Sequence, residues 1–205
     1  MKKIKIFSII TLLTGISSIS FAQPGKIDLT LNYSVNSPLG NFKSASVSET
    51  SFRGWNGRLM YNINNKLAVG LGTGFNDYYQ KYPRQVYEDK NNAISAVLTN
   101  SVQTTPVLVE GRYTFTPNSP FRPYIGLGVG GNLVYYRQYL GEFADSKSGF
   151  YFAAQPEVGA NIRFSRNGTP AFTIGANYSY MPFNYGNVKD LNNWGVYAGF
   201  KFSIK

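Results

Sequence analysis

The sequence predicts an all-β fold, a closed barrel of eight antiparallel strands in up-and-down order. Three observations support this prediction. Large apolar residues alternate with small or polar ones along most of the chain, and a period of two is typical of an extended strand with two unlike faces. The composition is rich in tyrosine, phenylalanine and glycine, which suits twisted β-structure. Short and long connections alternate between the segments, as in a series of hairpins.

Eight segments show this alternation and are the predicted strands. In the third of them, Leu71 and Phe75 belong to a bulky apolar face, whereas Gly72 and Asn76 belong to a small or polar face. Since the second face is too small and polar to form a hydrophobic core, the bulky face is the one expected to contact lipid. The segments span about 27–35, 52–63, 66–79, a stretch ending with 107–115, 123–136, 150–164, 171–181 and 194–204.

The connections at the two ends of these strands differ in length. Three are short turns (62–66, 116–121 and 165–170), and the Asn167-Gly168 pair in the last favours a tight hairpin. Short turns at one end and long loops at the other are typical of a transmembrane β-barrel in a bacterial outer membrane, with short periplasmic turns and longer extracellular loops. The longer, polar connections are 36–51, 80–98, 137–149 and 182–193.

Aromatic residues on the bulky face cluster near both ends of the predicted strands. The set near the short turns is Tyr61, Tyr113, Phe115, Phe164, Phe172 and Phe202. The set near the long connections is Tyr33, Trp55, Phe75, Tyr135, Phe152, Tyr180 and Trp194. Two aromatic belts are expected where a barrel meets the two surfaces of a membrane.

The first 22 residues have the pattern of a secretory signal peptide. A basic start (1–5) precedes an apolar stretch (6–13), and Ser20-Phe21-Ala22 has small residues where cleavage requires them. We expect cleavage between Ala22 and Gln23, so that residues 23–205 form the barrel domain. After export, we expect this barrel domain to reside in the bacterial outer membrane.

Composition and charge limit the chemistry of the chain. It has no Cys and no His, which excludes a disulfide, a thiol nucleophile and a histidine base; we expect no enzyme, no cofactor and no metal site. After cleavage, 17 basic and 10 acidic residues leave a net charge near +7. For an exported protein this favours anionic outer-membrane lipid of the lipopolysaccharide type as a partner over nucleic acid, with a merely solvated basic surface as the alternative.

A glycine-rich motif in the fifth predicted strand invites a different interpretation. Residues 126–131 match the G-x-G-x-x-G pattern of dinucleotide-binding sites. Such a site needs a helix directly after the motif, and here residues 132–136 continue the strand pattern. Small residues facing a crowded interior explain the motif better.

The face opposite the lipid carries charges of both signs, and these are candidate site residues. Isolated charges in a narrow interior are costly, so we expect them to form an ion-pair network. Eight strands leave an interior just wide enough for side chains, which favours a plugged lumen over the alternative of a narrow pore for ions or small solutes. The network residues are Arg58, Glu110, Arg112, Glu157 and Arg163, and Asp28 and Lys201 also face inward.

Two prolines fit the strand pattern less well. Pro106 and Pro156 lie within predicted strands, where each lacks a backbone N–H for the ladder. We expect a β-bulge at each position, or a place above the membrane for Pro106.

The second long connection is the candidate binding surface, because it combines tyrosine and arginine, which are favoured at interfaces. Its residues are Tyr82, Arg84 and Tyr87. The alternative is that the flanking strands continue beyond the bilayer and these residues are ordinary strand surface. A soluble, lipocalin-like ligand-binding barrel is the alternative fold, in which the apolar face would point inward.

The chain resembles a known family. The architecture is similar to the small eight-stranded barrels of the OmpA transmembrane-domain and OmpX type, and Tyr33-Ser34-Val35 followed by residues 38–42 resembles the first strand and loop of outer-membrane β-barrel-domain proteins. The resemblance covers the mature chain and departs at its end, where Ser203-Ile204-Lys205 replaces a terminal aromatic residue. It implies insertion by the barrel-assembly machinery and a structural or surface-interaction role toward an unknown extracellular ligand.

Overall fold

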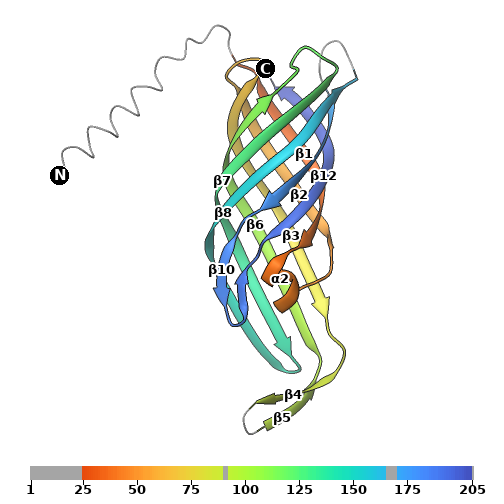
Figure 1. Cartoon of the computed structure of the whole chain (residues 1–205), viewed down its shortest axis with the longest axis vertical. Helices are drawn as coiled ribbons and strands as arrows, with labels where there is room; N and C mark the ends of the chain where they lie inside the picture. The colour runs from red at the N-terminus through yellow and green to blue at the C-terminus, as the bar shows by residue number, and fades with distance from the viewer. Residues whose placement is uncertain (1–24, 90–91, 165–169, 205) are drawn as a thin grey trace, which may run out of the picture.

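Eight antiparallel strands close into a barrel in the computed structural model, which describes residues 25–89, 92–164 and 170–204. Each barrel strand pairs with its neighbours along the chain, and the first pairs with the last, from Ile27 opposite Ile204 to Pro38 opposite Asn193 (Figure 1). The predicted up-and-down barrel is confirmed. Its strands are β1 (Ile27–Pro38), β2 (Ser51–Asn62), β3 (Leu67–Lys81), β6 (Leu98–Thr114), β7 (Phe121–Leu140), β8 (Phe143–Arg163), β9 (Ala171–Ser179) and β12 (Asn193–Ile204).

A short helix and two small hairpins lie in the long connections. The first connection contains the six-residue helix α2 (Gly40–Ala45), the second the hairpin β4 (Gln85–Asp89) and β5 (Asn92–Ala96), and the last the hairpin β10 (Pro182–Tyr185) and β11 (Val188–Asp190). In the part of the chain that the structure describes, no helix has the length and apolar character to cross a membrane.

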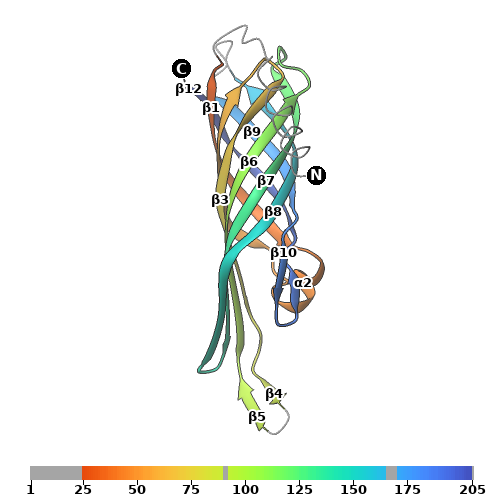
Figure 2. The same ribbon diagram turned by 90° about the vertical axis from the view of Figure 1, so that its left-hand side faces the viewer.

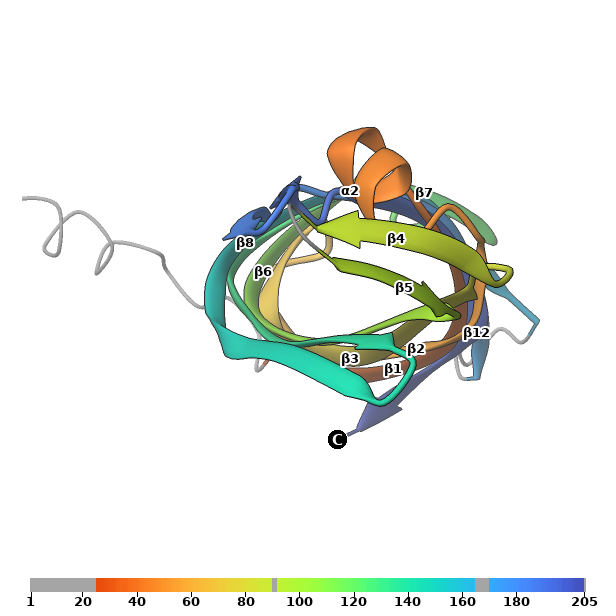
Figure 3. The same ribbon diagram turned by 90° about the horizontal axis from the view of Figure 1, so that it is seen from below.

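The short and long connections lie at opposite ends of the barrel (Figures 1 and 2). β1 begins and β12 ends at the short-turn end, and α2 and both small hairpins lie at the long-connection end. Seen from the latter end, the strands form a ring with α2 at its edge (Figure 3). The signal-peptide prediction and the Asn167-Gly168 turn lie outside the described residues.

The two faces of the strands have the polarity that the alternation predicts. Outward-facing Leu71 and Val109 are 60% and 65% exposed, whereas inward-facing Asn32, Thr30 and others are buried. This is the reverse of a soluble barrel, so the lipocalin-like alternative is wrong. The buried polar set includes Asp28, Thr30, Asn32, Ser34, Asn36, Arg58, Glu110, Arg112, Asn132, Glu157, Asn161, Thr173 and Asn177.

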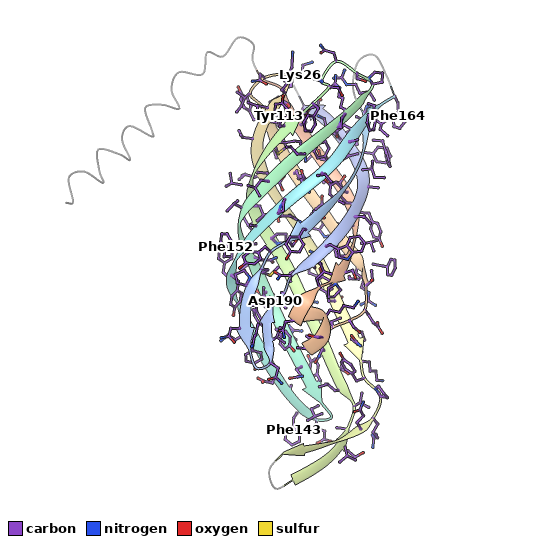
Figure 4. All side chains as sticks on the ribbon, viewed as in Figure 1. Lys26, Tyr113, Phe143, Phe152, Phe164 and Asp190 are labelled. Carbon is purple, nitrogen blue, oxygen red and sulfur yellow. The ribbon has the colours of Figure 1, made fainter. Side chains whose placement is uncertain are left out.

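Aromatic side chains on the outer surface follow the predicted belts. Figure 4 shows Tyr113 and Phe164 near the short-turn end and Phe152 closer to the long-connection end. Phe164 is 70% exposed and Phe152 50%. Between the belts the outer surface is formed by aliphatic residues such as Leu71.

The long connections differ from the predicted loops, because much of their length is strand. Residues 137–149 are predicted to be a long, polar connection, yet β7 and β8 stay paired as far as Leu140 opposite Phe143, and Gly141 has the positive φ that the tight turn needs. β3 and β6 continue to Lys81 opposite Thr99, as in the alternative that the strands flanking the second connection are longer. We call this four-stranded extension the arm; it consists of residues 77–81, 98–103, 137–140 and 143–148.

The expected bulges at the two prolines are absent. Pro106 stays in register with Asn132 of β7, and Pro156 with Leu127. Instead, the pairing of β6 with β3 is interrupted at Pro106, and the pairing of β8 with β9 is interrupted at Pro156. In both cases the register is the same on the two sides of the interruption. Skipping ladder pairs on one side accommodates the missing N–H without adding a residue.

Candidate functional site

Four charged side chains from three strands meet inside the barrel. Arg58 of β2 lies between two carboxylates: its Nε is 3.0 Å from Glu110 Oε2 of β6, and its second terminal nitrogen is 2.7 Å from Glu157 Oε2 of β8. Arg112 of β6 contacts the other oxygen of Glu157 at 2.9 Å. The four side chains are 2–8% exposed. Two positive and two negative charges therefore compensate each other at one level of the interior.

Two tyrosines complete this group. The hydroxyl of Tyr197 donates to Glu157 Oε2 at 2.7 Å and lies 2.9 Å from the hydroxyl of Tyr124. The guanidinium of Arg58 lies over the ring of Tyr197, and that of Arg112 lies 4.1 Å from the ring centroid of Tyr124. The sequence prediction missed these tyrosines as site residues, although their inward position in the alternation could have indicated them. We call Arg58, Glu110, Arg112, Glu157, Tyr124 and Tyr197 the ion-pair layer.

Glycines on neighbouring strands provide the space for these side chains. A Cβ atom on Gly72 would come 2.0 Å from Glu110 Oε1, and one on Gly126 would come 2.7 Å from Glu157 Oε1. Any larger residue at either position would displace a carboxylate from its arginine. Two glycines of the G-x-G-x-x-G motif, Gly126 and Gly128, thus serve packing in the interior, whereas Gly131 lies against the exposed ring of Phe150 on the outer face.

A second ion pair lies nearer the short-turn end. Lys201 Nζ of β12 is 2.7 Å from Asp28 Oδ2 of β1. The hydroxyl of Ser203 donates to the other oxygen of Asp28 at 2.6 Å, and the amide of Asn62 donates to Oδ2 at 2.8 Å. The Asp28 carboxylate is thereby fully engaged.

The structure does not bring Arg163 into the ion-pair layer. It lies six residues after Glu157 on the same strand, which separates them by about 20 Å along β8. Both side chains point inward, but at different depths. Arg163 lies instead at the short-turn end, close enough to Arg122 of β7 for their charges to repel.

A polar region lies between the ion-pair layer and the long-connection end. The amide of Asn36 donates to Asn76 Oδ1 at 2.7 Å, and that of Asn32 donates to Asn56 Oδ1 at 2.7 Å. Beside them is a small cavity with room for about one water molecule. Polar side chains lining it include Ser34, Asn36, Asn56, Asn76, Gln155 and Asn177.

Apolar side chains from two connections pack with strand residues in a buried cluster at the long-connection end of the barrel. Phe42 of α2 packs edge-on against Tyr78 of β3, with ring centroids 5.1 Å apart, and Phe183 of β10 packs against Tyr151 and Tyr136. We call this cluster the cap. Its members are Phe42, Val47, Tyr78, Val102, Val134, Tyr136, Met181, Phe183, Val188 and Leu191, each at most 3% exposed.

Hydrogen bonds hold the first connection in the cap. The carbonyl of Ser46 accepts from the hydroxyl of Tyr82 at 3.0 Å and from the amide of Asn100 at 2.7 Å. Tyr82, a predicted surface residue, thus contacts the first connection. Arg84 is exposed between β3 and β4, whereas Tyr87 lies in β4 with a side chain outside what the structure describes.

Solved structures of small barrels are similar to this chain. Neisserial surface protein A is 16% identical, with 89% of this chain and 98% of that chain covered and a TM-score of 0.52. The outer membrane protein OprG from Pseudomonas aeruginosa is 16% identical, with 89% and 97% covered and a TM-score of 0.54. The outer membrane protease OmpT from Escherichia coli is 7% identical, with 90% and 98% covered and a TM-score of 0.50. At these identities the likeness shows the fold alone.

Comparison by sequence matches the chain to a family and to no individual curated protein. No curated protein matches the chain. The family of outer membrane protein beta-barrel domains matches residues 8–202, nearly the whole length. With the closed eight-stranded barrel and the similar solved structures, this match shows that the chain belongs to the outer membrane protein beta-barrel domain family.

Proposed function

We propose that this protein is a closed outer-membrane barrel that displays a rigid β-structure at the cell surface and has a structural or surface-interaction role. Membership of its family makes it an integral protein of the bacterial outer membrane. The short-turn end is periplasmic and the long-connection end extracellular. The proposal concerns what the interior and the extracellular arm do in that setting.

The observation that carries the proposal is the presence of two barriers in series along the interior. An ion crossing the barrel would have to separate the buried arginine–glutamate pairs of the ion-pair layer, which are 2–8% exposed. It would then have to pass the cap, whose side chains are at most 3% exposed. Each step moves a charge past groups that cannot replace its water shell, and this supports a plug over a pore.

The same interior supports a protein without catalytic activity. Both carboxylates of the ion-pair layer face arginines, so neither is positioned as a free general base. The chain supplies no histidine or cysteine to replace them. The similarity to a protease noted above is one of fold.

The extracellular arm supports the surface role. Four paired strands continue past the outer aromatic belt, and β4 and β5 extend the structure further (Figure 2). Paired strands would hold an exposed residue such as Arg84 at a more fixed distance from the membrane than an irregular loop would. Lipid of the lipopolysaccharide type would contact the base of this arm, and the barrel-assembly machinery would insert the chain.

Cysteine labelling in intact cells tests the display. The chain has no cysteine, so Arg84→Cys and Lys66→Cys each introduce one reactive thiol, on the arm side and in a periplasmic turn respectively. We expect a membrane-impermeant maleimide to label the Arg84 variant in intact cells and the Lys66 variant only after lysis. The reverse pattern would contradict the proposed orientation and display.

Solute influx tests the closed interior. The wild-type protein, refolded into liposomes, should not admit small sugars faster than protein-free liposomes do, because the ion-pair layer and cap fill the lumen. A general porin in matched liposomes is the positive control. Swelling at the rate of the porin control would support the narrow-pore alternative.

A further inference from the structure

The positive charge of the chain is distributed unevenly along the barrel axis. The extracellular segments (36–54, 77–103, 137–149 and 181–192) contain eight basic and seven acidic residues, and the ion-pair layer contains two of each. The described charged residues of the periplasmic end are Lys26, Asp28, Lys66, Arg122, Arg163 and Lys201, five basic and one acidic. The excess positive charge is therefore periplasmic.

Three of these cations gather at the inner side of the periplasmic mouth. Arg122 is the second residue of β7 and Arg163 the last of β8, and Arg122 pairs in register with Asn161, two residues before Arg163. Both arginines are half-buried and face inward. The charges of Arg163 and Asp28 act on Arg122, and that of Arg122 acts on Lys201.

The carboxylate at this mouth forms no ion pair with either arginine. Asp28 already binds Lys201, Ser203 and Asn62. Arg122 Nε donates to the carbonyl of Ser119 at 3.1 Å, a neutral acceptor. No described residue forms an ion pair or side-chain hydrogen bond with the guanidinium of Arg163.

Two neighbouring guanidinium groups without a carboxylate partner form a site that favours an anion. Like charges held close together and half-buried repel each other, and an anion between them would remove that repulsion. The planar donor fork of arginine matches the oxygens of phosphate in a bidentate geometry. Lys201 lies nearby, and its charge is compensated by Asp28, so Asp28 leaves the charges of the two arginines in excess.

We propose that the periplasmic mouth of the barrel binds a phosphate-bearing anion between Arg122 and Arg163. This site is separate from the proposed closed interior and surface role, since it lies on the periplasmic side of the ion-pair layer. Two sources could present the same chemistry there: a soluble phosphate compound of the periplasm, and the headgroup of an anionic phospholipid in the inner leaflet.

Calorimetric titration with inorganic phosphate tests the soluble source. The full barrel is refolded in zwitterionic detergent, and ionic strength is held constant with chloride. We expect saturable binding that weakens at least tenfold in the Arg122→Gln/Arg163→Gln variant, because each charge-assisted contact contributes about a factor of ten or more. The matched control, Arg84→Gln/Arg137→Gln, removes two extracellular arginines and should bind like the wild type.

Nanodiscs of defined lipid test the headgroup source. Replacing part of the phosphatidylcholine by phosphatidylglycerol should raise the thermal unfolding midpoint of the wild type and of the extracellular control, but not that of Arg122→Gln/Arg163→Gln. A response to either probe that is lost in this variant supports the site and identifies the source. The proposal is wrong if neither probe distinguishes the variant from the wild type while both migrate as folded barrels in unheated SDS gels.

Discussion

Glu157 is the residue on which the ion-pair layer depends most. Its carboxylate contacts Arg58 at 2.7 Å and Arg112 at 2.9 Å, and it accepts a hydrogen bond from Tyr197. Glu157→Gln would leave both arginines buried with too little negative charge, so we expect the free energy of unfolding to fall by about 3–5 kcal/mol. Urea titration of the refolded barrel in lipid vesicles measures this change.

Glu142 provides the matched control. It is an exposed glutamate in the turn between β7 and β8. Glu142→Gln should change the free energy of unfolding by no more than about 0.5 kcal/mol. If both variants lost the same stability, the ion-pair layer would have no special role.

Arg163 shows how far the sequence predicts single residues. Alternation assigns each side chain to a face, and it placed Arg58, Glu110, Arg112 and Glu157 in the interior where the structure has them. It gives no depth along the barrel axis, because the relative shift between strands depends on turns and closure rather than on periodicity. Arg163 therefore shared a face with Glu157 without being near it.

Strand β3 carries an apolar outer face whose centre is Leu71, between Leu67 and Phe75. A charge at the middle of such a strand would lie near the midplane of the bilayer. We expect Leu71→Lys to lower the free energy of unfolding in lipid vesicles by about 2–4 kcal/mol. Reversible unfolding followed by tryptophan fluorescence measures the loss.

Ser146→Lys is the control for this substitution, because Ser146 is exposed on the arm in strand β8. The same charge placed there should meet water and change stability by less than about 0.5 kcal/mol. Similar losses for both variants would mean that the membrane does not cover β3 as described.

The cap depends on Phe42 of helix α2. This side chain is fully buried against Tyr78, and the helix has only six residues, so tertiary packing must hold it in place. Phe42→Ala should lower the free energy of unfolding of the cap by about 3–5 kcal/mol. Amide hydrogen exchange should then accelerate in residues 39–47, while the amides of the barrel keep their protection.

Phe143→Ala is the matched control for the cap. Phe143 is 66% exposed at the tip of the arm, so its removal should leave exchange in residues 39–47 unchanged. Exchange that stays slow in the Phe42 variant would show that the cap does not hold the first connection.

Alternation predicts the strands inside the membrane better than the elements outside it, of which only the longer strands at the second connection were anticipated, and then as an alternative. Lipid on one side and a crowded polar interior on the other force alternation, as in residues 66–79. The arm meets water, so residues 143–148 are all exposed and carry no apolar alternation although they are strand. The cap places Tyr78 and Tyr136 inward, next to outward Tyr79 and Tyr135, which hides the period where both faces are aromatic.

At the scale of the whole molecule, polarity is organised in two directions. Across the barrel wall, apolar residues face outward and polar ones inward, which suits an integral membrane protein of this family. Along the axis, an excess of basic residues at the periplasmic mouth, the balanced ion-pair layer and the apolar cap follow one another. This series explains how a net basic chain can enclose a centre whose two arginines and two glutamates compensate each other.

Single-channel recording from the purified, refolded protein in planar lipid bilayers tests the closed interior most directly. Because the proposed function has the ion-pair layer and the cap close the lumen, we predict no unitary conductance above that of the bare bilayer at voltages that leave the membrane intact. Reproducible unitary steps of one size, from protein that migrates as a folded barrel in unheated SDS gels, would contradict this account.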